Sequence, residues 1–466
     1  MASGTYKELK TNIKCIQEIQ KFSMVQELNE HVQMKMTAIV KEKEKDEYVK
    51  SVSSKEPIEV YVEKNTIFKG IIKTAKIRQE GGFYFLEIQG TSYSFLTDIK
   101  KKCQSFQDKN QTYTEMIKSV LSGYEHSGVL DFASEGAAIK KLQLQYYETD
   151  WNYIKRMASH FNAGIIAECK MDGPKVYFGV PKGKNLGEIE DYEYKLSKDI
   201  AHYMKESKNT NQKLTEKDSI AIHITSNKDF NIGDYGTFGN NKMFIQKKTV
   251  KMSKGILRYD YVFTSKNGLI KSKIFNSKFV GVSIKGKVLE RVRDNLKVHL
   301  EIDNAQDKSK AWLFPYTTMY ASEGNSGWYC MPEENDTVLV YFPDAESGNA
   351  VATSSIRTQN SGGDKIDNPQ IKYFRTADGK EVMFSPEEIV ITCSDNAIYI
   401  SLNQSDGITI SSTENIKIKT DKKLTLEAEE KITIKAEEQI KMECKSSEIK
   451  MDGDIDIHGN EVKVNS

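Results

Sequence analysis

The sequence predicts a mainly β protein with an α+β amino-terminal region and a β-structured spike at its carboxyl-terminal end. Short runs rich in Thr, Val, Ile and Tyr alternate apolar and polar residues, as half-buried strands do. Near the carboxyl end, pairs of apolar residues recur every eight positions. The length of 466 residues exceeds what one hydrophobic core normally serves, so we expect about two to four domains.

The charge balance argues against binding to a polyanion by net charge. The chain has 67 Lys and Arg residues and 66 Asp and Glu residues. It therefore has no net electrostatic field that would attract nucleic acid or bind the chain to an anionic membrane. No apolar run approaches the roughly 18 residues that cross a bilayer, and residues 1–10 lack the apolar core of a signal peptide. We therefore expect the protein to stay in the cytoplasm until another component exports it.

The cysteines are scattered and form no CxxC pair, which predicts reduced structural thiols rather than a disulfide framework or a zinc site. The six are Cys15, Cys103, Cys169, Cys330, Cys393 and Cys444.

The first 95 residues or so alternate as strands do, for example at 57–62 and 82–88. From about 97 to 124 the pattern shifts toward a helical period, and a second helix is predicted at 150–161. Strands then return near residues 164–167 and 176–178.

The segment 183–218 is polar and rich in Lys, and its pattern does not choose between a helix and a surface excursion. Strand patterns resume at 220 and continue to about 263. We assign residues 1–275 to an α+β region, long enough for two β-barrels with helical insertions.

Residues 276–358 predict a small Greek-key barrel of the OB type, because several short strands follow one another closely. These strands are expected near 281–292, 297–302, 311–314 and 336–342. The Gly- and Asn-containing stretch at 359–364 predicts a linker, which with the following residues to 380 leads into the spike.

The clearest signal is an eight-residue repeat of apolar pairs, with looser copies on both sides that extend it across residues 381–466. The regular pairs are Ile408 and Ile410, Ile416 and Ile418, Leu424 and Leu426, Ile432 and Ile434, and Ile440 and Met442. Because side chains alternate along a strand, both members of a pair face one side. The next position on that side is always small: Ser412, Thr420, Ala428, Ala436 and Cys444.

Eight extended residues span only about 26 Å, too short for one chain to enclose a core in each turn. Either three repeats of one chain form each coil, or three chains each contribute one strand per layer. Three chains bury every pair, so we favour an intertwined triple-stranded β-helix in a homotrimer. An adhesin fibre would bury its apolar pairs in the same way. The domains upstream of the repeat must therefore decide between a fibre and another function.

One upstream segment carries a family resemblance. The sequence Gln-Tyr-Tyr-Glu-Thr-Asp-Trp-Asn-Tyr-Ile-Lys-Arg-Met at 145–157 resembles the QYxExDxxFxxR signature of VgrG and contractile-phage tail-hub proteins, and Ser-Phe-Gln at 105–107 is similar to their SFQ pattern. We expect Asp150 to be the N-cap of a helix and Trp151, Ile154 and Met157 to be its buried stripe. The motif is then structural and braces the hub barrels.

Two further segments are similar to the same family. Gly-Lys-Val at 286–288 and Ala-Trp-Leu at 311–313 resemble its OB domain, and 372–384 resembles the lead-in to its triple β-helix. The resemblance implies a trimer whose two tube-like barrels per chain mimic a hexameric ring of the inner tube. Its spike points outward and is driven through a target envelope when the sheath contracts.

The partners that the resemblance implies are further copies of the chain, the inner tube hexamer, baseplate wedge proteins, and a PAAR-like tip protein or an effector at the carboxyl end. The target envelope would be met only on firing. The protein would be cytoplasmic during assembly, then part of the membrane-facing end of an injection particle, and secreted on firing. Neither a lysozyme-like domain nor a toxin extension is expected.

No catalytic residue, metal or cofactor is predicted. The histidines lack metal-ligand spacing, and His458 near the tip lies next to Ile457 rather than in the HxH motif that holds iron in some related spikes. The carboxylates Glu429 and Glu430 fall in polar spacers, and no stacking platform for nucleic acid is evident. A cell-wall or polysaccharide hydrolase built on a β-helical tailspike remains the rival interpretation, beside the adhesin fibre.

Overall fold

The computed structural model describes residues 8–53, 56–210, 212–253, 255–322, 326–357, 367–394, 397–451, 453 and 461. The chain divides into two compact units, Met1–Gln359 and Asn360–Ser466, which are described separately below. The predicted linker at 359–364, the apolar pairs at 455 and 457 and at 462 and 464, and His458 lie outside the described residues. No helix in the described part of the chain combines the length and apolar character needed to cross a membrane.

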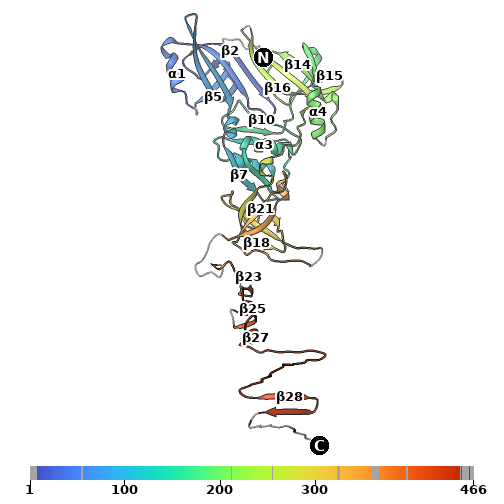
Figure 1. Ribbon diagram of the computed structural model, residues 1–466. Helices are drawn as coiled ribbons and strands as arrows, with labels where there is room; N and C mark the ends of the chain where they lie inside the picture. The colour runs from blue at the N-terminus through green and yellow to red at the C-terminus, as the bar shows by residue number, and fades with distance from the viewer. Residues whose placement is uncertain are drawn as a thin grey trace. The chain divides into compact units, whose positions relative to one another are not determined.

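The first unit is built on a 12-stranded sheet, in which β2 and β16 lie side by side (Figure 1). Along the sheet the strands run β1 (Leu9–Thr11), β4 (Pro57–Val62), β5 (Asn65–Glu80), β6 (Phe83–Ser92), β3 (Gln33–Val40), β2 (Ile16–Glu27), β16 (Asn241–Ser253), β17 (Ile256–Ser265), β14 (Ile220–Ser226) and β13 (Tyr194–Lys198). Off this path, β15 (Tyr235–Phe238) pairs with β16, and β12 (Asn185–Glu188) pairs with β15. Because β2 pairs antiparallel with β16, the strands predicted for two barrels run in one continuous sheet.

The two faces of this sheet differ in polarity. On β2, Phe22 and Met24 are buried, whereas Lys21 is exposed and Ser23 is half-buried. The neighbouring strands repeat this alternation, as expected where one face packs on a core and the other meets solvent. The apolar face therefore belongs to the large core of the unit.

Smaller elements cover part of this core. The α-helices are α1 (Lys45–Ser51), α2 (Tyr113–Leu121), α3 (Asp150–Ser159) and α4 (Ile200–Asn209). A two-stranded sheet pairs β7 (Lys101–Phe106) with β9 (Gln143–Thr149), and a three-stranded sheet holds β10 (Ile165–Ala167), β11 (Lys175–Phe178) and β8 (Gly128–Asp131).

The helical period predicted from about 97 to 124 is wrong for its first half. The helix α2 begins at Tyr113, after a capping box between Thr112 and Glu115. Residues of β7 pair instead with β9, more than 35 positions further along the chain, a partner that local periodicity does not reveal. The undecided segment 183–218 contains both kinds of structure, β12 and β13 followed by α4.

A second sheet of five strands closes the first unit, in the order β20 (Leu313–Pro315), β19 (Asn295–Leu300), β18 (Ser283–Val292), β21 (Thr337–Tyr341) and β22 (Val351–Ile356). All its pairings are antiparallel. Its core includes Phe279, Val298, Phe314 and Phe342. Leu142 and Leu144, which come from the region of β9, pack into the same core and tie this small barrel to the rest of the unit.

The second unit begins with an antiparallel meander of five strands: β23 (Lys372–Arg375), β24 (Glu381–Phe384), β25 (Glu388–Ser394), β26 (Ile398–Asn403) and β27 (Gly407–Ser412). A hairpin of β28 (Ile440–Cys444) and β29 (Ser447–Met451) follows. Residues 413–439 form neither helix nor strand within one chain. The intertwined triple helix therefore stays a prediction, since its strands need partners from other chains.

Candidate functional site

The signature segment forms a brace in which β9 runs directly into α3. The structure buries Trp151, Ile154 and Met157 on the inner face of the helix. Asp150 is not the N-cap that the sequence predicted. Thr149 has the extended backbone of a cap, and its hydroxyl accepts a hydrogen bond from the amide of Asn152 at 3.3 Å. Thr and Asp are both favoured caps, so two adjacent candidates could not be separated by residue type.

Asp150 is instead the centre of a buried hydrogen-bond network. Its carboxylate accepts from the Lys102 ammonium at 2.6 Å, the Tyr124 hydroxyl at 2.7 Å and the Gln145 amide at 2.8 Å. Three donors from three elements compensate the lost hydration of this fully buried charge. Gln145 and Asp150 of the signature segment thus have a structural role.

A second buried charge pair lies in the same brace. The Arg156 guanidinium donates through Nε to the Glu148 carboxylate at 3.2 Å and through Nη2 to the backbone oxygen of Leu144 at 2.6 Å. Arg156 and Glu148 are both buried. Each charge depends on the other, because removing one partner would leave the other unpaired in the interior.

The brace connects the large sheet to the small barrel through a joint that the sequence did not predict. The backbone amide of Ser105 donates to the Asp303 carboxylate at 2.6 Å, and its hydroxyl donates to the second oxygen at 2.5 Å. The side-chain oxygen of Gln107 accepts a hydrogen bond from the backbone amide of Trp312 at 3.0 Å, and its side-chain nitrogen donates to the backbone oxygen of Val298. Burial raises the pKa of Asp303, although the hydrogen bonds from Ser105 oppose this.

This joint explains the SFQ segment physically. Ser105 and Asp303 stand 198 positions apart, so no local pattern could pair them. The sequence offered the resemblance of residues 105–107 to the SFQ pattern, but its periodicity placed them in a predicted helix. The structure shows that Ser and Gln are there to hold the small barrel, while Phe106 faces the large core.

The predicted spike residues form an open apolar face in the second unit. The register places Val382, Ile391, Ile400 and Ile410 opposite one another in one row, and Phe384, Ile389, Leu402 and Ile408 in the next. Ile408 and Ile410 are 72% and 60% exposed. The opposite face holds the covered side chains, among them Val390, Thr392 and Ser401.

The remaining predicted pairs are also open to solvent in one chain. Ile418 is 71% exposed and Leu426 67%, and every described member of the regular pairs except Ile440, which is half-buried, is at least 46% exposed. These are Ile416, Ile418, Leu424, Leu426, Ile432, Ile434 and Met442. A soluble protein rarely leaves such a long run of large apolar side chains uncovered.

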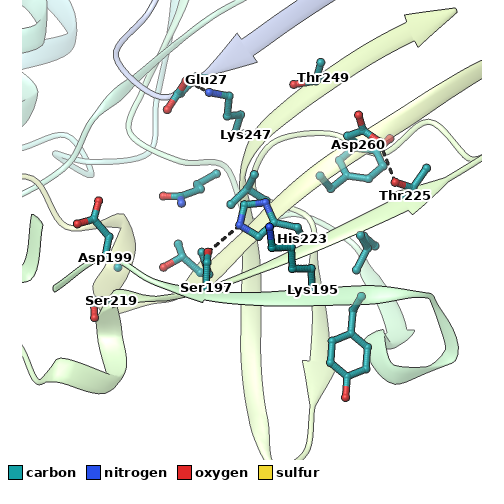
Figure 2. A pocket seen from close by; sticks show the side chains of 18 of the residues that line it. Glu27, Lys195, Ser197, Asp199, Ser219, His223, Thr225, Lys247, Thr249 and Asp260 are labelled. Carbon is teal, nitrogen blue, oxygen red and sulfur yellow. Dashed lines mark hydrogen bonds and ion pairs between the residues drawn. The ribbon is translucent and has the colours of Figure 1, made fainter. Parts of the chain in front are cut away.

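Figure 2 shows a pocket of about 810 Å³ on the polar side of the large sheet. Ser197 Oγ and His223 Nε2 lie 2.8 Å apart, and the Lys247 ammonium lies 2.7 Å from the Glu27 carboxylate. Thr225 donates to Asp260 at 2.8 Å. The pocket is thus lined by polar groups that already bond to one another, from β2, β13, β14, β16 and β17.

Among the described residues, no group of three or more His, Cys, Asp or Glu side chains is placed to hold a metal ion.

Comparison with known proteins gives matches in structure alone. No family model matches the sequence, and no curated protein matches it. Among solved structures, the chain is similar to the Escherichia coli c3393 protein, described as a component of the type VI secretion system with structural similarity to the phage T4 tail proteins gp27 and gp5. The TM-score is 0.52 at 11% identity, covering 75% of this chain and 99% of that one.

Two further matches are chains of the Francisella PdpA–VgrG complex. The lidded form gives a TM-score of 0.51 at 11% identity, covering 86% of this chain and 79% of that one. The half-lidded form gives 0.50 at 12% identity, covering 86% and 87%. The mainly β fold and the resemblance to VgrG and tail-hub proteins that the sequence predicted are therefore confirmed at the level of the fold.

Proposed function

We propose that this chain is the structural hub and spike of a contractile injection machine, and that it acts as a homotrimer without enzymatic activity. The observation that carries the proposal is the open apolar face of the second unit, which stands in the same chain as a tail-hub fold. A face of this kind needs partners, and two rows of matched side chains favour identical copies around a common axis. The trimer would bury each apolar pair against its symmetry mates.

In this proposal the first unit caps the inner tube as a pseudo-sixfold ring and contacts baseplate wedge proteins. The second unit is the piercing spike, and a PAAR-like tip protein or an effector binds its carboxyl end. The brace around α3 then has a mechanical purpose, because a load on the small barrel reaches the large sheet through buried ionic and hydrogen-bonded contacts. The protein is assembled in the cytoplasm and leaves with the particle, carrying cargo when the sheath contracts.

The test is the molar mass of the purified full chain, measured by light scattering together with its sedimentation. We expect a trimer, and pull-down of the inner tube protein of the same machine. A folded, soluble single copy would contradict the proposal.

A hydrolase on a β-helical spike is the alternative that the same preparation can examine. Peptidoglycan and capsular polysaccharide are incubated with the protein, with Ser197→Ala and His223→Ala variants as controls for the pocket of Figure 2. We expect no soluble fragments. Release of fragments that stops in either variant would replace the structural proposal with an enzymatic one.

A further inference from the structure

The polar face of the large sheet carries a row of cations that the proposed function does not use. We call it the basic band and define it as Lys21, Lys35, Lys76, Lys251 and Arg258, one each from β2, β3, β5, β16 and β17. All five side chains are exposed. The immediate neighbours of four of them, Phe22, Met36, Val250 and Leu257, are buried on the opposite face, so strand alternation puts these four cations on one side. The register places Lys76 on that side too, because it is opposite Glu87, and Glu87 and Lys21 are both opposite Thr37.

The strand register brings these residues together. Lys251 is directly opposite Arg258 on one side and Ser23 on the other, and Ser23 is opposite Lys35. The next positions along β2 and β5 are Lys21, opposite Thr37, and Lys76, opposite Glu87. With β6 between β3 and β5, the band crosses six neighbouring strands, a distance of about 24 Å at the usual strand spacing.

Carboxylates on this face do not balance the band. Asp260 lies 3.1 Å from Lys251, whereas two other carboxylates of this face pair with cations outside the band: Glu87 lies 3.1 Å from Arg78 and Glu27 lies 2.7 Å from Lys247. Lys21, Lys35 and Arg258 have no carboxylate within ion-pair distance in the described residues. Glu18 lies on the same face but beyond an irregularity of β2 that separates it from Lys21.

The pair of Lys251 and Arg258 points to a ligand most directly. Like charges directly opposite each other on an antiparallel pair destabilise a sheet. Here they stand next to Lys35 across one small serine, which leaves room for an incoming group. An anion in this place would relieve the repulsion and bind three cations at once.

We propose that the basic band docks an acidic segment of a second protein, a partner or passenger of the hub. The band is about the length of seven extended residues at roughly 3.3 Å each, so a run of Asp and Glu could lie across it. The side chains between the cations are Ser23, Thr37, Thr74 and Gln89, which can hydrogen-bond to a polypeptide backbone. The inference needs the sheet alone and does not depend on the trimeric spike.

Nucleic acid fits this face less well. Phe85 lies on the same face as Glu87, but the Arg78 guanidinium already covers its ring at 5.0 Å from the centroid, so that ring is not open for a base to stack on. The experiment therefore includes an oligonucleotide as a competing ligand.

The test uses the full chain and fluorescein-labelled poly-L-glutamate, with binding followed by fluorescence anisotropy at low and at physiological salt. We expect saturable binding that weakens as salt rises. The double variant Lys35→Gln/Arg258→Gln should bind about fivefold more weakly, since each exposed ion pair contributes a factor of about two to five. The matched control Lys101→Gln/Lys118→Gln removes two exposed cations from β7 and α2 and should bind as the wild type does.

Three results would overturn the inference: no binding at low salt, an equal loss in the control variant, or tighter binding of a thymidine oligonucleotide of matched charge. Molar mass is measured on the same samples. If the protein is a monomer and still binds poly-L-glutamate through the basic band, the proposed trimer is refuted and the docking inference is supported.

Discussion

The large sheet of the first unit, apart from the parallel pair of β12 and β15, and the meander of the second unit are antiparallel, but one covers its apolar face and the other exposes it. In the first, Phe22 and Met24 lie in a core while Lys21 meets solvent. In the second, Ile408 and Ile410 face solvent while Thr392 and Ser401 are covered. The same alternation of side chains therefore produces a self-sufficient fold in one region and an incomplete one in the other.

The difference shows what an amphipathic pattern does and does not determine. A strand pattern guarantees an apolar face, but a core forms only if another element of the chain can cover it. In the first unit helices and small sheets do so. In the described part of the second unit, the segments between the apolar pairs are spacers rich in Lys and Glu, which cannot cover the apolar face and so favour cover by other copies.

The largest expected effect comes from charging the open face. Ile432 is 54% exposed in one chain, and Ile432→Asp would place three carboxylates on one dry layer of a trimer, at a cost of several kcal/mol each. We expect loss of the trimer in analytical ultracentrifugation. Lys431→Asp, one position away and on the outward side of the strand that the trimer would form, should keep it. A trimer that survives the Ile432 change would show that the two sheets differ for another reason.

The next effect concerns the self-sufficient region. Arg156→Met leaves the buried Glu148 carboxylate without its partner and should lower the free energy of unfolding of the first unit by about 3–5 kcal/mol. Urea unfolding followed by tryptophan fluorescence measures this. Adding Glu148→Gln should recover much of the loss. If trimer formation fails in the single variant while the first unit is still folded, the two regions are coupled more tightly than proposed.

The two units should differ in how their stability responds to acid. Burial, with Arg156 and Lys273 nearby, lowers the pKa of His160 from 6.5 to about 3. The unfolded chain takes up this proton first, so stability is present above pH 6.5 and is lost as the pH falls toward 3, by about 1.4 kcal/mol per unit at most. Thermal unfolding of the first unit should show this slope, and His160→Gln should flatten it.

The sequence of the second unit has one histidine, His458, and none among the regular apolar pairs, so the molar mass should change little between pH 7 and 5.5. Dissociation of the trimer in that range, with the first unit still folded, would contradict the assignment of the acid response to the first unit.

The smallest effect tests the corrected helix start. Thr149→Ala removes the hydroxyl that accepts from Asn152 and should cost about 1 kcal/mol of unfolding free energy. Thr149→Ser keeps that acceptor and should restore most of the stability. A serine variant as unstable as the alanine variant would mean that the lost methyl contact, and not the cap, stabilises α3.

Local patterns predicted much of what is regular in this chain. The helix at 150–161 and its inward face with Trp151, Ile154 and Met157 follow from a 3.6-residue period, and the strands near 281–292 and 336–342 follow from alternation. The eight-residue repeat was visible in the sequence for the same reason. Each of these signals depends on residues that are close along the chain.

Tertiary structure decided which distant residues meet. Three contacts join segments far apart in the sequence: β7 with β9, β2 with β16, and Ser105 with Asp303. The local periodicity of one segment does not reveal which distant segment it will contact. Asp150 is of a residue type that often forms a helix N-cap. Its carboxylate is instead buried and accepts hydrogen bonds from three donors elsewhere in the fold. A period fixes which face of an element is apolar, whereas the choice of what covers that face, and of which charges are buried with it, belongs to the whole fold.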